Sequence, residues 1–145
     1  MPGSGRIVVN AADPALAATL DMGCWTPRET FSHWVAADWQ ARVLSADGSH
    51  FEVLHRGEVA GVVSWPLIGM HNVDNAIAAV AAACHAGAPA AAAIEALGRF
   101  RGVRRRMELR GVAAGVSVYD DFAHHPTAIA TTLEGLGGRV GHARI

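Results

Sequence analysis

The residue pattern of this chain changes at Pro66, and the change limits the folds that the chain can adopt. From Phe31 to Trp65, short runs of β-branched and aromatic residues are separated by the turns Ala46-Asp-Gly-Ser49 and Arg56-Gly57. Such a pattern is typical of an antiparallel meander. After Pro66 the apolar residues recur at helical spacing. We therefore expect an α/β protein.

Caps and periodicity place the elements around this meander. A strand at Arg6–Val9 precedes a helix that begins at Asp13-Pro14, because an aspartate cap followed by proline is a preferred helix start. After Pro66 we expect one helix with Val73, Ile77, Val80 and Cys84 on one face, and a second at Ala90–Leu97. An arginine-rich connector, a strand at Val116–Tyr119 that is buried on one face, and a helix from Pro126 follow.

All 12 basic residues are arginine, and the chain has no lysine. Without lysine, the chain cannot form a Schiff base with a substrate or use a lysine as a general base. It also lacks the Gly-Lys-Ser/Thr sequence of a Walker A loop. The formal net charge of -1 argues against a general binder of nucleic acid or of anionic membranes. Any nucleotide chemistry in this chain must therefore use a lysine from elsewhere or proceed without a lysine.

The cysteines and the apolar runs favour a cytoplasmic chain. Cys24 and Cys84 are sixty residues apart, which favours a reducing compartment over disulfides or a thiolate zinc site. The opening stretch Met1–Gly5 is polar, unlike a secretion signal. The longest apolar run, Ala76–Cys84, is about half as long as a membrane span. We expect a soluble, cytoplasmic protein with no membrane partner.

The first motif that could carry chemistry is Gly69-Met-His-Asn-Val-Asp-Asn75, at an expected junction of strand and helix. Asn72 and Asn75 lie one helical turn apart and face the same way. Two carboxamides offer donors and acceptors that can recognise a purine edge. Alternatively, Asn72 serves only as the N-cap of the helix.

The second motif is the connector, where six of the twelve arginines lie within residues 99–110 and Arg104-Arg-Arg106 are consecutive. We expect Arg99, Arg101 and Arg110 to form a solvated surface. An RNA-binding patch is disfavoured, because no aromatic residues are interleaved for base stacking. An arginine at a domain junction can also clamp a ribose or a phosphate with its planar guanidinium.

The third motif, Tyr119-Asp-Asp-Phe-Ala-His-His-Pro126, is the most informative. In open α/β sheets, ligands bind beyond the carboxyl ends of strands, and helix N-termini attract phosphate. Aspartate and histidine there suit a sugar hydroxyl, a metal ion or a phosphoryl oxygen. In one alternative the carboxylates only accept from turn N–H groups and the histidines are exposed caps. The other, a self-contained hydrolytic metal site, lacks further ligands at suitable spacing.

Taken in order, three motifs resemble the Mur ligase family: Gly69-x-His71-Asn72-x-x-Asn75-Ala76, Phe100-x-Gly102-Val103-x-Arg105-Arg106-x-Glu108 and Asp120-Asp121-Phe-Ala-His124-His125-Pro126-Thr127. The double histidine resembles the branch that acts on UDP-N-acetylmuramic acid. Ile7–Asn10, Gly23–Pro27 and Leu44–Gly48 most resemble the member that attaches the tripeptide L-Ala-γ-D-Glu-meso-diaminopimelate during peptidoglycan recycling. The member that attaches L-alanine is the alternative.

The resemblance implies the end of a central ATP-binding domain at residues 1–103, made of meander and helices, and the start of a Rossmann-like C-terminal domain at residues 104–145. It implies an interior part of a three-domain enzyme, whose uridine-nucleotide domain, Walker lysine loop and carbamylated magnesium-holding lysine lie before this part. The implied reaction uses ATP and Mg²⁺ to convert the muramyl carboxylate to an acyl phosphate, which the tripeptide amine attacks. By itself, this chain is expected to be inactive and to bind ATP weakly at best.

The resemblance also implies roles for particular residues, none of them a metal ligand. Five are expected to bind ATP: His71, Asn72 and Asn75 at the adenine, and Arg106 and Asp121 at the ribose. His124 is the expected catalytic residue, approaching the phosphate or magnesium, while Arg105, Asp120 and His125 support the others. Two other classes stay open, namely a non-catalytic adenine-nucleotide module that gates a partner and an interaction domain whose motifs are only caps and turns.

Overall fold

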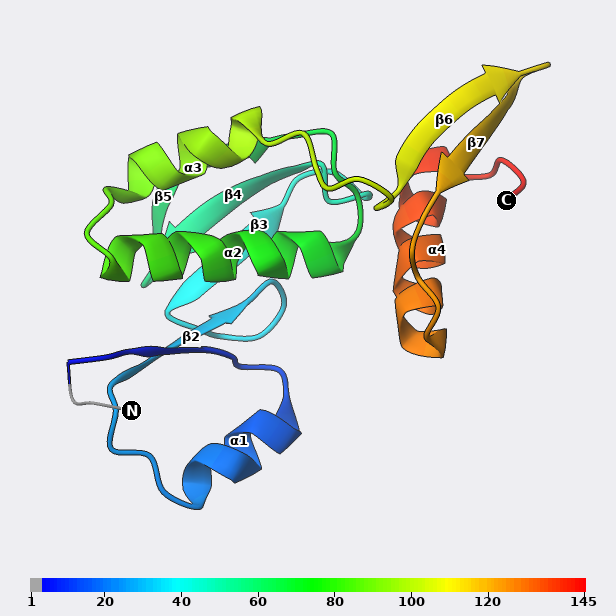
Figure 1. Ribbon diagram of the computed structural model, residues 1–145. Helices are drawn as coiled ribbons and strands as arrows, with labels where there is room; N and C mark the ends of the chain where they lie inside the picture. The colour runs from blue at the N-terminus through cyan, green and yellow to red at the C-terminus, as the bar shows by residue number, and fades with distance from the viewer. Residues whose placement is uncertain (1–3) are drawn as a thin grey trace.

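A computed structural model describes residues 4–145, so most of the opening stretch Met1–Gly5 lies outside the described residues (Figure 1). The elements are β1 (Ile7–Asn10), α1 (Pro14–Asp21), β2 (Arg28–Ser32), β3 (Trp39–Val43), β4 (His50–His55), β5 (Glu58–Ser64), α2 (Met70–His85), α3 (Ala90–Arg99), β6 (Glu108–Ala113), β7 (Val116–Asp120) and α4 (Pro126–Val140). No helix within residues 4–145 is long and apolar enough to cross a membrane.

The first five strands form one sheet in the order β1-β2-β3-β4-β5. The strands β3, β4 and β5 are antiparallel neighbours, which confirms a meander from Trp39 onward. The strands β1 and β2 pair in parallel, with α1 between them in the chain. As predicted, α1 begins at the Asp13-Pro14 cap, and the Asp13 carboxylate accepts from the backbone N–H groups of Ala15 and Leu16.

The expected meander does not extend back to Phe31, because β2 pairs with β3 in parallel, through Phe31–Trp39 and Ser32–Gln40. Side-chain hydrogen bonds hold the short connection between these strands. The Ser32 hydroxyl accepts from two backbone N–H groups in the connection, and the Asp38 carboxylate accepts from the backbone N–H of Thr30 at 2.8 Å. Because alternation of apolar residues carries no information about strand direction, the sequence pattern predicted the wrong pairing here.

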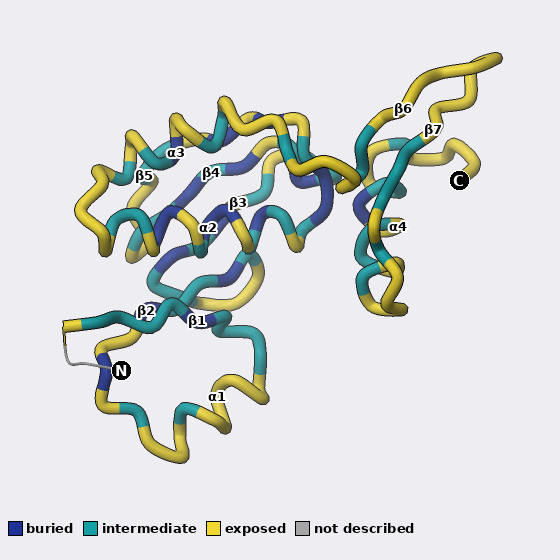
Figure 2. Tube along the Cα trace, viewed as in Figure 1, coloured by how far each residue is buried: buried dark blue, intermediate teal, exposed yellow. Residues whose placement is uncertain are grey.

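Helices α2 and α3 cover one face of the sheet, and the core lies between the two layers (Figures 1 and 2). The predicted apolar face of α2 is confirmed, since Val73, Ile77 and Val80 are at most 1% exposed. Ile94 of α3 joins the same cluster. On the sheet side, the buried ring of Phe51 meets Trp65 edge to face at a centroid distance of 5.5 Å. This packing fixes the α2 N-terminus against the segment that follows β5.

The chain after α3 forms the antiparallel hairpin β6–β7 and the helix α4. The predicted strand near Val116–Tyr119 and the helix from Pro126 are confirmed. Burial of that strand was predicted wrongly, because Val116 and Val118 are 63% and 52% exposed. Within residues 4–145, β7 pairs only with β6, and most of this hairpin is exposed (Figure 2).

Candidate functional site

A cavity of about 1130 Å³ lies where the segment after α3 meets the N-terminal turns of α2. Its wall comes from the β5–α2 connection, α2, the connector after α3, the hairpin and α4. Five of the six candidate residues line it: His71, Asn72, Asn75, Arg106 and Asp121. The fold therefore brings the first and third motifs to one space, although about fifty positions separate them in the chain.

The α2 N-terminus begins at Gly69, whose backbone (φ 95°, ψ 139°) is accessible to glycine and strained for other residues. Gly69 occupies the N-cap position, without a side-chain cap, so the interpretation of Asn72 as an N-cap is wrong. Asn72 lies within the first turn, and its Nδ2 donates to the carbonyl of Ile68 at 2.8 Å. That bond orients the carboxamide and leaves its oxygen unused by any described hydrogen bond. Asn75 lies one turn further along the cavity wall.

Asp121 has a clear structural role as well as a place in the cavity. One carboxylate oxygen accepts from the backbone N–H of Met107 at 2.8 Å, and the other from that of Ala123 at 2.7 Å. These two bonds confirm the part of the alternative in which Asp121 accepts from backbone N–H groups. Each carboxylate oxygen has a second lone pair, so the same group can still accept from a ligand.

The connector is held against the β7–α4 loop, which presents Arg106 to the cavity. The backbone N–H of Phe122 donates to the carbonyl of Arg105 at 2.9 Å, and Arg105 and Met107 have positive φ angles of 60° and 48°. The guanidinium groups of Arg105 and Arg106 lie 5.5 and 5.9 Å from the Phe122 ring centroid, within the range of cation–π attraction. Both arginines are exposed, and the aromatic ring of Phe122 lies close enough to restrict the positions of their guanidinium groups.

His71 lies within electrostatic range of both parts of the chain. Partial burial is the largest influence on the pKa of His71 and lowers it below its ordinary value. The carboxylate of Asp121 raises this pKa, and the guanidinium of Arg106 lowers it. Since the net direction is downward, the imidazole is mainly neutral at pH 7 and can both donate and accept a hydrogen bond.

His124 lies outside the group that lines the cavity. It is exposed on the β7–α4 loop, its Nδ1 lies 2.9 Å from the carbonyl of Phe122, and its ring meets the Phe122 ring edge to face at 5.1 Å. His125 precedes α4 and makes no side-chain cap bond. The catalytic role expected of His124 stays a prediction.

Sequence reasoning assigned no site role to several residues that line the cavity. Among them are Arg101, which is exposed as expected but also lines the cavity, and Arg139 of α4. No local pattern distinguishes Arg139, because the groups that its guanidinium contacts, the carbonyl of Pro66 and the carboxylate of Asp47, are more than seventy positions earlier in the chain.

The resemblance implies magnesium, which requires a cluster of oxygen ligands. Within residues 4–145 there is no cluster of three or more histidine, cysteine, aspartate or glutamate side chains suited to a metal ion. The described residues do not fit a complete magnesium site, and no residue of this chain is assigned to the metal.

Comparison with known proteins identifies the two parts of the chain. Residues 1–83 match the profile of the Mur ligase middle domain, and residues 105–145 match that of the Mur ligase glutamate ligase domain. The predicted boundary near Val103 lies between these two ranges and stays a prediction in its exact position.

Individual relatives agree with these matches. The chain is 51% identical over 141 residues to the Escherichia coli UDP-N-acetylmuramate–L-alanyl-γ-D-glutamyl-meso-2,6-diaminoheptandioate ligase, covering 97% of this chain and 30% of the relative. It is 41% identical to the Acaryochloris marina UDP-N-acetylmuramate–L-alanine ligase over 84% of this chain and 25% of the relative.

A crystal structure of a murein peptide ligase from Psychrobacter arcticus superposes with a TM-score of 0.74 at 43% identity, covering 99% of this chain and 31% of the other. The chain thus spans between a quarter and a third of the length of these relatives. The chain belongs to the Mur ligase family, with the end of a middle domain followed by the start of a glutamate ligase domain.

Proposed function

We propose that this chain is the nucleotide-binding part of an ATP-dependent ligase that joins UDP-N-acetylmuramate to the tripeptide L-Ala-γ-D-Glu-meso-diaminopimelate in peptidoglycan recycling. The observation that carries the proposal is the shared cavity, in which His71, Asn72 and Asn75 face Arg106 and Asp121. The relative that is named for the tripeptide is 51% identical to this chain, whereas the relative that is named for L-alanine is 41% identical over a smaller share of it. This difference favours the tripeptide over L-alanine as the second substrate.

The carboxamides of Asn72 and Asn75 recognise the adenine in this proposal. A purine edge presents both a donor and an acceptor, and a carboxamide can match both. The bond from Asn72 to Ile68 fixes which of its atoms are available. The neutral imidazole of His71 adds a group that can act as either donor or acceptor beside the base.

Arg106 and Asp121 hold the ribose. The Asp121 carboxylate is fixed by two backbone N–H groups, so accepting from a ribose hydroxyl requires no reorganisation of this side chain. The Arg106 guanidinium is held near the Phe122 ring, and its planar array of donors suits the hydroxyl and ring oxygens of a sugar.

The chemical step in the proposal transfers the γ-phosphoryl group of ATP to the muramyl carboxylate, giving an acyl phosphate and ADP. The tripeptide amine then displaces phosphate to form the amide. This chain contributes by holding the nucleotide between its two parts and by excluding water from the acyl phosphate, which water would otherwise hydrolyse. His124 is proposed to approach the phosphates from the β7–α4 loop. The chain contains no lysine, so we expect the isolated chain not to turn over ATP.

The test is a titration of the isolated chain with ATP, followed by backbone amide chemical shifts. We expect shifts at the α2 N-terminus and near Asp121, and weaker binding for Arg106→Gln. Arg104→Gln is the matched control, since Arg104 is an exposed neighbour that does not line the cavity. GTP should bind more weakly than ATP if the carboxamides read adenine. Equal effects of the two arginine variants, or equal binding of GTP and ATP, would reject the proposed site.

A further inference from the structure

Helix α4 approaches the first part of the chain through two glycines. A Cβ atom at Gly135 would lie 2.8 Å from the Cα of Gly69, and one at Gly138 would lie 2.6 Å from the carbonyl oxygen of Ala46. Gly135 is the buried residue of α4. The helix therefore packs backbone to backbone, and any side chain at these two positions would hold it away.

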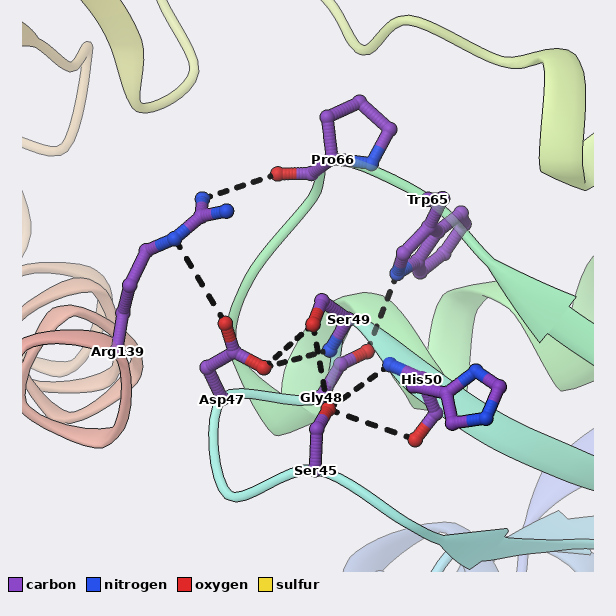
Figure 3. A network of polar contacts seen from close by, with 8 residues as sticks. All are labelled: Ser45, Asp47, Gly48, Ser49, His50, Trp65, Pro66 and Arg139. Carbon is purple, nitrogen blue, oxygen red and sulfur yellow. Dashed lines mark hydrogen bonds and ion pairs between the residues drawn. The ribbon is translucent and has the colours of Figure 1, made fainter.

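The surface under α4 is a rigid turn, Ser45–Ser49, that is anchored in the core (Figure 3). The buried Trp65 indole donates to the carbonyl of Gly48 at 3.1 Å. The Asp47 carboxylate accepts from the backbone N–H of Ser49 at 3.0 Å and from its hydroxyl at 2.7 Å. Because these bonds fix the turn to the sheet, α4 docks on a preformed surface.

Arg139 adds an ion pair and a hydrogen bond to the contact between α4 and the first part of the chain. Its Nε lies 3.7 Å from the Asp47 carboxylate, and its Nη1 donates to the carbonyl of Pro66 at 3.3 Å (Figure 3). The Asp47 side chain is only 12% exposed. Burial opposes its ionisation, but hydrogen bonds from Ser49 and Ser45 and the charge of Arg139 outweigh burial and lower the pKa of Asp47. The carboxylate therefore stays charged and available to Arg139 at neutral pH.

The same turn holds the start of α2. The backbone N–H of Gly69 donates to the carbonyl of Asp47 at 2.7 Å. On its other side Gly69 supports the imidazole of His71, because a Cβ at Gly69 would lie 2.6 Å from Cε1 of that ring. Gly69 is thus enclosed by α4, the turn and His71, so the position of α4 determines how the second part of the chain sits against the α2 N-terminus.

We propose that Arg139 is a positioning residue for the cavity: together with Gly135 and Gly138, it fixes α4 on Gly69 and the Ser45–Ser49 turn. This docking holds His71 and Asn72 opposite Arg106 and Asp121. The part of the inference that concerns ATP rests on the proposed function, whereas the docking itself does not.

The first test compares three glycine-to-alanine variants in one helix. Gly135→Ala and Gly138→Ala place a Cβ against backbone, whereas Gly137→Ala meets only Ile145 Cδ1 at 4.0 Å. Each of the three substitutions raises the helix propensity of its position by a similar amount. A difference among the three variants therefore reports how α4 docks on the first part of the chain. We expect Gly135→Ala and Gly138→Ala to shift the Gly69 and Gly48 amides and to raise the pKa of His71 as its ring becomes more solvated. The Gly137→Ala chain should resemble the original chain in both measurements.

The second test uses Arg139→Gln, Asp47→Asn, their combination, and the exchange Asp47→Arg with Arg139→Asp. A partly exposed ion pair corresponds to about a two- to fivefold change in an equilibrium constant. Each single variant should weaken ATP binding by about that factor, the two effects should not multiply, and the exchange should recover part of the loss.

The outcomes separate the inference from the proposed function. If the original chain does not bind ATP but Gly135→Ala alters the His71 titration and Gly137→Ala does not, the docking stands and the proposed function fails. The positioning role is overturned if Gly135→Ala and Gly137→Ala have the same His71 titration and Gly69 amide shift. It is also overturned if the charge variants change ATP affinity by independent, multiplying factors.

Discussion

Gly69→Ala tests whether the start of α2 is held in a conformation that only glycine adopts easily. The native φ of 95° and ψ of 139° cost an alanine about 1–3 kcal/mol. The new Cβ would also lie 2.6 Å from the His71 ring, and displacing the ring from its rotamer adds about 0.5–1.5 kcal/mol. Alanine loses less entropy on folding, which returns about 0.4–1 kcal/mol. The expected net loss is therefore about 0.5–4 kcal/mol.

Gly87→Ala is the matched control, because Gly87 has a φ of 98° and no atom within 4 Å of an added Cβ. Its cost comes from the backbone alone, and we expect about 1 kcal/mol. Urea denaturation measures both variants, and an ATP titration shows whether displacement of His71 also weakens binding. Equal losses of stability in the two variants, with unchanged ATP affinity for Gly69→Ala, would refute the contact between Gly69 and His71.

Two further predictions concern stability. Ile77→Ala should lower the free energy of unfolding by about 2–5 kcal/mol, because Ile77 is fully buried in the core. Leu133, whose side chain is 47% exposed, provides the control: Leu133→Ala should lower the same free energy by less than about 1 kcal/mol. Urea denaturation measures both variants. The Thr30 backbone N–H is the largest influence on the pKa of Asp38 and lowers it from 3.8, against the opposing effect of burial. A depressed carboxyl pKa stabilises the fold above the unfolded value, so this contribution to stability should be lost as the pH falls below 3.8 and through the lower pKa of the folded state. Asp38→Asn should reduce that dependence in urea midpoints measured against pH.

Local patterns predicted much of the fold. The apolar face of α2, the Asp13-Pro14 start of α1 and the start of α4 at Pro126 are all confirmed. Each depends on residues within one or two helical turns, where backbone geometry and cap chemistry act directly. The parallel pairing of β2 with β3 was not predicted, since it depends on side-chain bonds from Ser32 and Asp38 that leave no periodic trace.

The candidate site was predicted in part. Asn72, Asn75, Arg106 and Asp121 belong to motifs with recognisable spacing, and all four line the cavity. The N-cap interpretation of Asn72 failed because Gly69 starts the helix three residues earlier. His124 belongs to the same motif as Asp121 but lies outside the cavity lining, because its ring packs on Phe122 and its Nδ1 lies next to the carbonyl of that residue.

The sequence by itself determined most of the elements, though not β6, together with the three motifs and the absence of lysine, because each is a property of neighbouring residues or of composition. Only the tertiary structure decided that Arg139 reaches Asp47 and that two glycines of α4 rest on Gly69 and Ala46. These contacts join segments that are distant in the chain, and their geometry depends on how the layers pack. A glycine in a helix sequence does not reveal whether an added side chain would meet little, as at Gly137, or another backbone, as at Gly135.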